Sequence, residues 1–114
     1  MPRNVSSVNV VFLHSAERDV LELKDYVVKN FGKIAWRTSY KKIKDAVIRL
    51  KKFPLEGHVP DELASLNVTQ YRQVIAGMNR MIYEVRGQTL YVHIVCDTRK
   101  DMQSLLTRRL LRAD

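Results

Sequence analysis

The chain has 114 residues, of which 46% are hydrophobic and 28% are charged, and this length predicts a single domain over residues 1–114. These proportions are ordinary for a globular protein and argue against a disordered chain. Lys and Arg total 20 against 12 Asp and Glu, so the formal net charge is +8. A basic chain of this size suggests an acidic or polyanionic partner.

The sequence contains no apolar run long enough to form a transmembrane helix, so we expect no membrane partner. Its first residues lack the apolar core of a secretory signal, which predicts a cytoplasmic location. The single cysteine, Cys96, excludes an internal disulfide and a multi-cysteine zinc site, and we expect it to be a buried structural thiol. No metal or other cofactor is expected.

The N-terminal part predicts a strand followed by two helices. Residues 8–13 form a short β-branched, apolar run, which is typical of a strand. Apolar residues then recur every three or four positions, which predicts an amphipathic helix with Ser15 as its N-cap and Gly32 as its end. A second stripe at helical spacing runs from Trp36 to Leu50. Two helices joined at one glycine predict an antiparallel helical hairpin.

The second predicted helix carries most of the excess charge. Residues 33–52 contain eight basic residues and one acid, Asp45, a net charge of +7. One interpretation is an ordinary solvated helix face, and the other is an electrostatic surface for a partner. The basic residues are Lys33, Arg37, Lys41, Lys42, Lys44, Arg49, Lys51 and Lys52.

The middle of the chain predicts a loop and then three strands. Residues 54–69 are acidic and contain two prolines and a glycine, which indicates a surface loop with one short helical turn near 61–66. The hydrophobic period then changes to two, and short glycine-containing turns separate the runs. The predicted strands are 71–76, 80–86 and 89–95.

The last segment has a leucine stripe at helical spacing, which predicts a C-terminal helix opened by a capping box of Thr98 and Asp101. The resulting order, β-α-α-β-β-β-α, predicts an α+β fold. In this fold an antiparallel sheet carries the N-terminal helical hairpin on one face and ends in the C-terminal helix. The first strand must also find a neighbour, because an isolated strand leaves its backbone unpaired.

Alternation along the strands assigns side chains to the two faces of this sheet. In the last strand we expect Leu90, Val92 and Ile94 to pack on the helices and Val95 to face the other way. Polar and aromatic residues are then expected to gather on or near an uncovered second face. These are Arg72, Arg80, Glu84, Tyr91 and His93.

The polar residues of this face have both chemical and ordinary interpretations. His93 could shuttle protons because the pKa of a histidine lies near neutrality, although a single histidine in a strand is more often structural. Arg72 and Arg80 could bind a phosphate, or they could simply pair with Glu84 across the strands. The sequence contains no glycine-rich phosphate loop, zinc-ligand spacing or hydrolase motif.

The strand region is similar to the RelE/ParE superfamily of bacterial toxins. The resemblance rests on YRQV at 71–74, NRMIYEV at 79–85, LYVHIV at 90–95 and DTRKD at 97–101. The N-terminal strand and helical hairpin agree with it, so it covers about residues 8–112.

The resemblance implies the growth-inhibiting toxin of a type II toxin–antitoxin system. The expected partner is a cognate antitoxin, with which the toxin would form a hetero-oligomer. Charge complementarity with an acidic antitoxin segment suggests contacts at Arg72, Arg80, Lys41 and Lys44.

The resemblance favours the ParE-like branch, whose members poison DNA gyrase and are not enzymes. The C-terminal segment is rich in Leu and Arg, and no Tyr, His or Glu follows Thr98. A toxin of this branch would hold a gyrase–DNA intermediate. The candidate contacts to the target are Arg99, Arg108, Arg109 and Arg112.

The alternative branch is RelE-like and would make this chain a ribosome-dependent mRNA endoribonuclease. Its basic residues bind the scissile phosphate while the RNA 2′-OH attacks it. The candidate catalytic residues are Arg72, Arg80, His93 and Arg99. A third possibility is an inactive or nucleic-acid-binding member of the superfamily.

Overall fold

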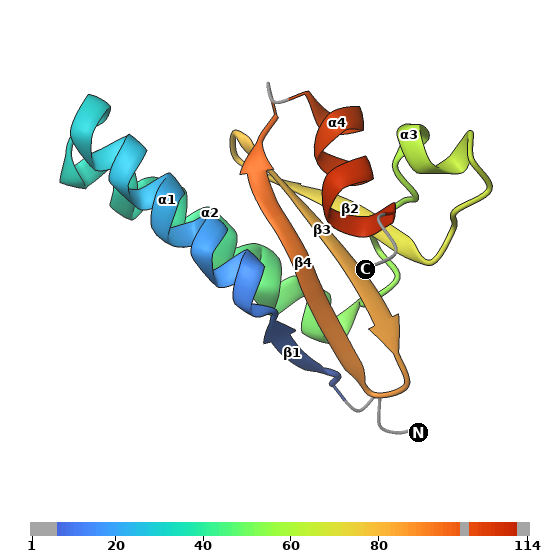
Figure 1. Cartoon of the computed structure of the whole chain (residues 1–114). Coiled ribbons are helices and arrows are strands. Elements are labelled where there is room, and N and C mark those ends of the chain that lie inside the picture. The colour runs from blue at the N-terminus through green and yellow to red at the C-terminus, as the bar shows by residue number, and fades with distance from the viewer. Residues whose placement is uncertain (1–6, 99–100, 112–114) are drawn as a thin grey trace.

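The computed structural model describes residues 7–98 and 101–111 (Figure 1). It has the predicted α+β fold and the predicted order of elements. The elements are β1 (Asn9–Phe12), α1 (His14–Phe31), α2 (Lys33–Lys52), α3 (Asp61–Ala64), β2 (Tyr71–Ala76), β3 (Asn79–Arg86), β4 (Thr89–Asp97), α4 (Met102–Leu106) and the π-helical segment η1 (Thr107–Leu111).

The four strands form one sheet in the order β1-β4-β3-β2. β2, β3 and β4 form the expected antiparallel meander, because two tight turns connect them. Gly77 and Gly87 occupy these turns with φ values of 68° and 58°, which a glycine adopts without strain. β1 pairs in parallel with β4, and this supplies the neighbour that the first strand needs.

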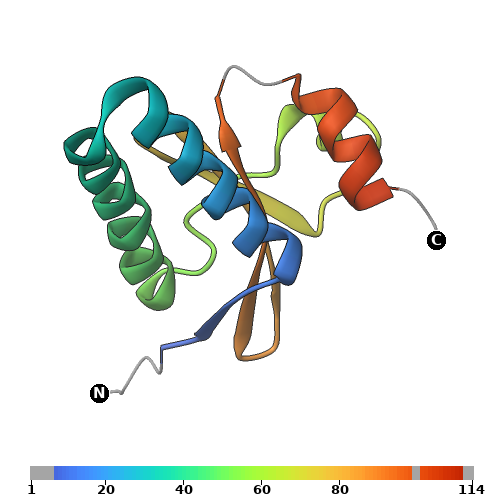
Figure 2. The same ribbon diagram turned by 60° about the vertical axis from the view of Figure 1, so that its left-hand side comes forward.

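The helical hairpin turns at Gly32, which has a φ of 94° and donates its backbone N–H to the carbonyls of Val27 and Val28. Figure 2 shows α1 and α2 side by side, with α4 on the opposite side of the sheet. The predicted N-cap is wrong. The cap position is Leu13 and makes no side-chain cap hydrogen bond, whereas Ser15 lies inside the helix.

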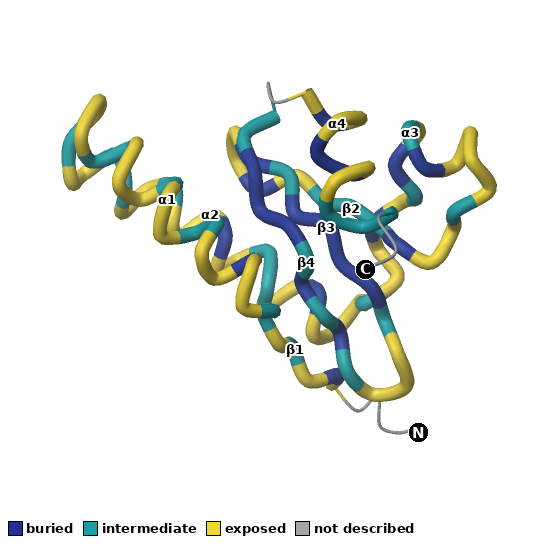
Figure 3. The backbone as a smooth tube through the Cα atoms, in the orientation of Figure 1, coloured by how far each residue is buried: buried dark blue, intermediate teal, exposed yellow. Residues whose placement is uncertain are grey.

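Each face of the sheet has its own apolar core, and the buried backbone follows β3 and β4 (Figure 3). The core under the hairpin contains Val8, Ala16, Ile43, Leu50, Ala76, Met81, Tyr83, Leu90, Val92 and Val95. The core on the other face contains Leu63, Tyr71, Ile82, Ile94, Cys96, Met102, Leu105 and Leu106. The prediction of an uncovered second face is therefore wrong, because the leucine stripe of α4 packs on it. Cys96 is buried as expected.

A bulge in β4 changes which residues face each core. The register between β3 and β4 shifts between Ile82 and Tyr83, and His93 is the extra residue. An extra residue reverses the alternation beyond it. Ile94 therefore packs under α4 and Val95 under the hairpin, the opposite of the prediction.

The start of α4 also differs from the expected capping box. Asp101 is itself the N-cap, and its carboxylate accepts hydrogen bonds from the backbone N–H of Ser104 at 3.2 Å and from the Ser104 hydroxyl at 3.0 Å. Thr98 instead donates its backbone N–H to the carbonyl of Met78 in the preceding turn. Within the described ranges, no helix is long and apolar enough to cross a membrane.

Candidate functional site

Arg72 lies on the hairpin face of β2, in register with Tyr83 of the first core. Its guanidinium donates to the carbonyls of Gly57 at 2.7 Å and Leu55 at 3.3 Å. The Tyr83 hydroxyl accepts the backbone N–H of Gly57 at 3.0 Å. A Cβ at Gly57 would meet that hydroxyl at 2.7 Å, so only glycine fits here. Arg72 and Tyr83 thus hold the loop after α2 against the sheet.

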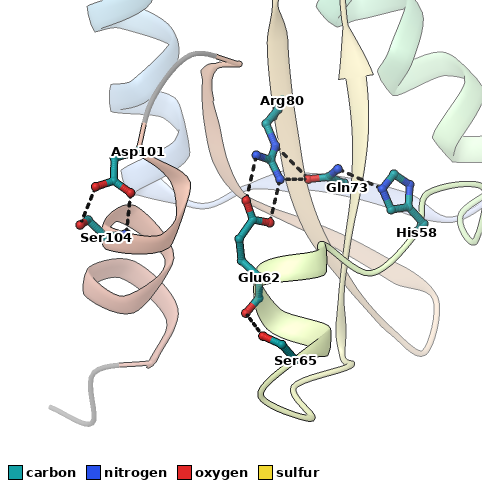
Figure 4. Close-up of polar contacts among 7 residues, drawn as sticks. All are labelled: His58, Glu62, Ser65, Gln73, Arg80, Asp101 and Ser104. Carbon is teal, nitrogen blue, oxygen red and sulfur yellow. Dashed lines mark hydrogen bonds and ion pairs between the residues drawn. The ribbon is translucent and has the colours of Figure 1, made fainter.

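Arg80 lies on the opposite face, where it joins two strands to α3 (Figure 4). It donates from Nε to the Gln73 side-chain oxygen at 2.9 Å and from Nη1 and Nη2 to the Glu62 carboxylate at 3.4 and 3.3 Å. Gln73 in turn contacts the ring of His58 at 3.0 Å. Burial alone would raise the pKa of Glu62, but the hydrogen bonds and charge of Arg80 outweigh it and lower the pKa. The charge of Arg80 is therefore balanced within the fold.

His93 and Glu84 form a second polar cluster on the same face. His93 Nε2 lies 3.1 Å from the Glu84 carboxylate, which also accepts a 2.9 Å hydrogen bond from Arg86. The rings of Tyr71 and His93 pack nearly perpendicular to each other, with centroids 5.2 Å apart. Burial lowers the pKa of His93, against the opposing effect of Glu84. Burial would raise the pKa of Glu84, but Arg86 and His93 outweigh it and lower the pKa.

The edge of β4 beyond the end of β1 is completed by side chains instead of a strand. Asp19 of α1 accepts the backbone N–H of Val95 at 3.0 Å, and Arg109 of η1 donates to the carbonyl of His93 at 2.8 Å. The two side chains also form a bidentate ion pair, with distances of 3.1 and 3.0 Å. This pair connects α1, β4 and the C-terminal helix, which are far apart in the sequence.

A groove of about 760 Å³ lies beside this ion pair, between α1 and α4. Arg108 is exposed at this groove, whereas the side chain of Arg109 is only 21% exposed. The other candidate target contacts, Arg99 and Arg112, lie outside the described residues. The groove is lined by acidic, aromatic and apolar residues as well, including Glu22, Tyr26, Asp97 and Leu105.

The predicted site residues do not form one cluster. Four of the five expected on one face share it, namely Arg80, Glu84, Tyr91 and His93. Arg72 does not, because it shares the hairpin face with Val74, which packs on the first core. The suggested pairing of Arg72 or Arg80 with Glu84 is also wrong, since the arginine that forms an ion pair with Glu84 is Arg86.

The two lysines suggested as antitoxin contacts lie on the hairpin, away from these clusters. Both are exposed on α2. Lys41 forms a 3.0 Å ion pair with Asp45, and the Lys44 ammonium lies 5.0 Å from the centre of the Tyr40 ring. Their charges therefore remain at the surface.

The sequence reasoning missed two carboxylates, Asp19 and Glu62. Asp19 is three residues after the buried Ala16, so helical spacing alone predicts that it lies on the inner side of α1. Glu62 lies in α3, within the segment predicted to be an acidic loop, and nothing in the sequence links it to Arg80, 18 residues later.

Comparisons with known proteins agree with this architecture. Among curated proteins there is no match. A chain of the structure described as "Chromosomal ParDE TA system from P. aeruginosa" aligns with a TM-score of 0.66 and 15% identity, covering 81% of this chain and 97% of that one. A chain of the toxin–antitoxin complex RelBE2 from Mycobacterium tuberculosis aligns with a TM-score of 0.54 and 16% identity, covering 87% and 100%.

Because both identities are low, these structural similarities establish the fold alone. The family assignment comes from the sequence. A family model described as the ParE toxin of the type II toxin–antitoxin system parDE matches residues 10–102, which is most of the chain. The match includes the hairpin, all of the sheet except Asn9, and the first residue of α4. The chain therefore belongs to the ParE toxin family of type II toxin–antitoxin systems, within the RelE/ParE superfamily.

Proposed function

We propose that this toxin inhibits bacterial growth by poisoning DNA gyrase, without catalysing a reaction of its own. The observation that carries this proposal is the match to the ParE family over residues 10–102. The C-terminal region adds support, because Arg108 is exposed beside a groove and has no carboxylate partner among the described residues. Such a residue is available to contact a target.

In this proposal the C-terminal helix binds gyrase, and this binding alone stabilises a gyrase–DNA intermediate. Arg108 supplies a charged contact at the rim of the groove. Arg109 acts as a positioning residue, because its pair with Asp19 fixes η1 against α1 and β4. A partly buried ion pair of this kind orients a helix more than it attracts a ligand.

The ribonuclease alternative receives less support from the candidate residues. Arg72 binds two backbone carbonyls on one face, and Arg80 is paired with Glu62 on the other. The His93 side chain is 15% exposed and its Nε2 is directed at Glu84. These groups do not converge on one phosphate, whereas catalysis requires them at hydrogen-bonding distance from it.

We further propose that a cognate antitoxin neutralises the toxin in the cytoplasm as a hetero-oligomer. The two similar solved structures are described as toxin–antitoxin assemblies. Of the four contacts suggested from charge, Lys41 and Lys44 are exposed, whereas Arg72 and Arg80 would have to leave their present partners. An acidic antitoxin segment would therefore contact α2 first.

Induced expression in a bacterial host, followed by mapping of both RNA and DNA, tests the choice of target. A gyrase poison leaves mRNA intact and causes filamentation with gyrase-dependent DNA breaks. Substitution of Arg108→Ala is expected to reduce the breaks at least tenfold, whereas Arg18→Ala, an exposed arginine on α1, is the matched control. Codon-phased mRNA cuts with intact DNA would overturn the proposal.

A further inference from the structure

We propose that one face of α2 binds the phosphate backbone of duplex DNA. The face consists of Lys33, Arg37, Lys41, Lys44 and Lys51, called the α2 stripe below. The proposal goes beyond gyrase poisoning, because it assigns direct contact with DNA to a surface far from the C-terminal helix. Figure 1 shows the hairpin extending away from the sheet and α4.

Four of these residues, Lys33, Arg37, Lys44 and Lys51, lie in a line along the helix, and Lys41 lies about 80° to one side of it. The 18 positions from Lys33 to Lys51 make about five turns, so both residues project in the same direction. Arg37 and Lys44 lie within about 40° of that direction, and the line is about 27 Å long. All five side chains of the α2 stripe are exposed.

The charges of the α2 stripe are poorly balanced by neighbouring residues. Among the described residues, Lys41 alone in the stripe has a carboxylate partner, Asp45, in an exposed pair. The ion pairs of α1 are directed elsewhere, from Glu17 to His14 and from Asp19 to Arg109. The hairpin therefore presents a concentrated positive potential along one helix.

A straight row of cations complements a stiff, uniformly charged polyanion. Duplex DNA carries a phosphate charge about every 1.7 Å along its axis and stays straight over a length far exceeding this row. The side chains of lysine and arginine are long enough to follow a phosphate chain without a fixed docking geometry. The expected binding is therefore insensitive to base sequence and strongly dependent on salt.

Two exposed apolar residues, Ile34 and Ile48, lie beside the α2 stripe. They would suit an amphipathic acidic protein segment, such as that of an antitoxin. Both partners would then compete for the same helix face. The test therefore includes an acidic polypeptide as well as DNA.

The experiment is fluorescence anisotropy of a labelled duplex of random sequence, titrated with the full chain at 50 to 200 mM salt and without gyrase. About four phosphate contacts predict a slope near −3.6 in the plot of log affinity against log salt. Over this range the affinity should fall about 150-fold. The double variant Arg37→Gln with Lys44→Gln should reduce the slope by about 1.8, since each phosphate contact contributes about 0.9.

The matched control is Arg18→Gln with Lys24→Gln, which removes the same charge from exposed positions of α1. It should keep the original slope, and both variants should keep the melting temperature. The proposal is overturned by absence of binding at 50 mM salt, by equal losses in the two variants, or by polyglutamate competing as well as DNA at equal charge. Gyrase plays no part in this measurement, so its outcome and that of the gyrase test are separate.

Discussion

The two faces of the sheet are covered by different means. Two long helices cover one face, and their apolar stripes continue the core of the sheet. Short helices cover the other, where ion pairs add to a smaller core. Glu62 and Asp19 pair with arginines that are 18 and 90 residues away along the chain.

The hairpin face therefore depends on apolar patterns that are local in the sequence. The face under α4 depends in addition on polar contacts between residues far apart in the sequence. The burial of apolar side chains is not directional, so a helix with an apolar stripe can pack on the sheet in spite of small changes in side-chain shape. A partly buried ion pair requires both partners, because one left alone is a desolvated charge without compensation. Substitutions should therefore act differently on the two faces.

The largest expected effect is in the core under the hairpin. Leu90 is fully buried, and Leu90→Ala should lower the free energy of unfolding by about 3 kcal/mol, because it leaves a cavity between the helices and the sheet. Urea unfolding measures this loss. The exposed Leu21, in α1, serves as a control whose alanine variant should change stability by less than about 0.5 kcal/mol. Equal effects would show that the hairpin core contributes little.

The next effect concerns the ion pair at the edge of β4. Arg109→Gln should cost about 2 kcal/mol, because Asp19 and the carbonyl of His93 both lose a charged donor. Amide hydrogen exchange should also show faster exchange in α4 and η1 than in α1. The neighbouring Arg108→Gln, at an exposed position, should leave both stability and exchange unchanged. Similar behaviour of the two variants would contradict the positioning role of Arg109.

Much of the fold was predictable because its signals are local. The helix break at Gly32, the tight turns and the two helical stripes each depend on a few neighbouring residues. The sequence-based assignment of faces failed at His93, because an extra residue reverses the alternation and nothing in the composition of β4 marks it. The second face was expected to be bare, because the stripe of α4 did not indicate where it would pack.

The candidate site was less predictable, because its residues act through partners distant in the sequence. Arg80 could be recognised as a polar residue in a strand, but its partner Glu62 belongs to the short helix α3, 18 residues earlier. Arg72 was expected beside Arg80, although its shared face with Val74 already pointed toward the hairpin. Exposed charges such as Lys44 were easier to identify, since a dense cationic helix seldom becomes buried.

A smaller effect is expected at the pair that links α3 to the sheet. Glu62→Gln should cost about 1.5 kcal/mol, because Arg80 is only 13% exposed and loses its compensating charge. Glu56→Gln breaks the surface pair with Arg49 and should cost less than about 0.5 kcal/mol. Urea unfolding compares them, and a double-mutant cycle with Arg80→Met isolates the coupling. Equal costs would place the Arg80 pair among ordinary surface contacts.

The smallest effect is a dependence of stability on pH through His93. Its pKa is lowered in the folded protein, mainly by burial, so folding favours the neutral ring. This contribution is complete above the ordinary pKa of about 6.5 and is lost as the pH falls below it. Glu84 and Glu62, whose pKa values are also lowered, add a further loss below about pH 4.5.

The variant His93→Gln separates the pH range in which His93 titrates from the lower range of the two glutamates. Glutamine can still donate a hydrogen bond to Glu84 but does not titrate. Urea unfolding at pH 7.5 and 5.5 should show a decrease in stability for the native chain and a smaller decrease for the variant. His58→Gln is the control, since its ring is exposed and forms its hydrogen bond with the side-chain amide of Gln73 instead of a carboxylate. If His93→Gln leaves the pH dependence intact, the neutral His93–Glu84 hydrogen bond does not stabilise the second face.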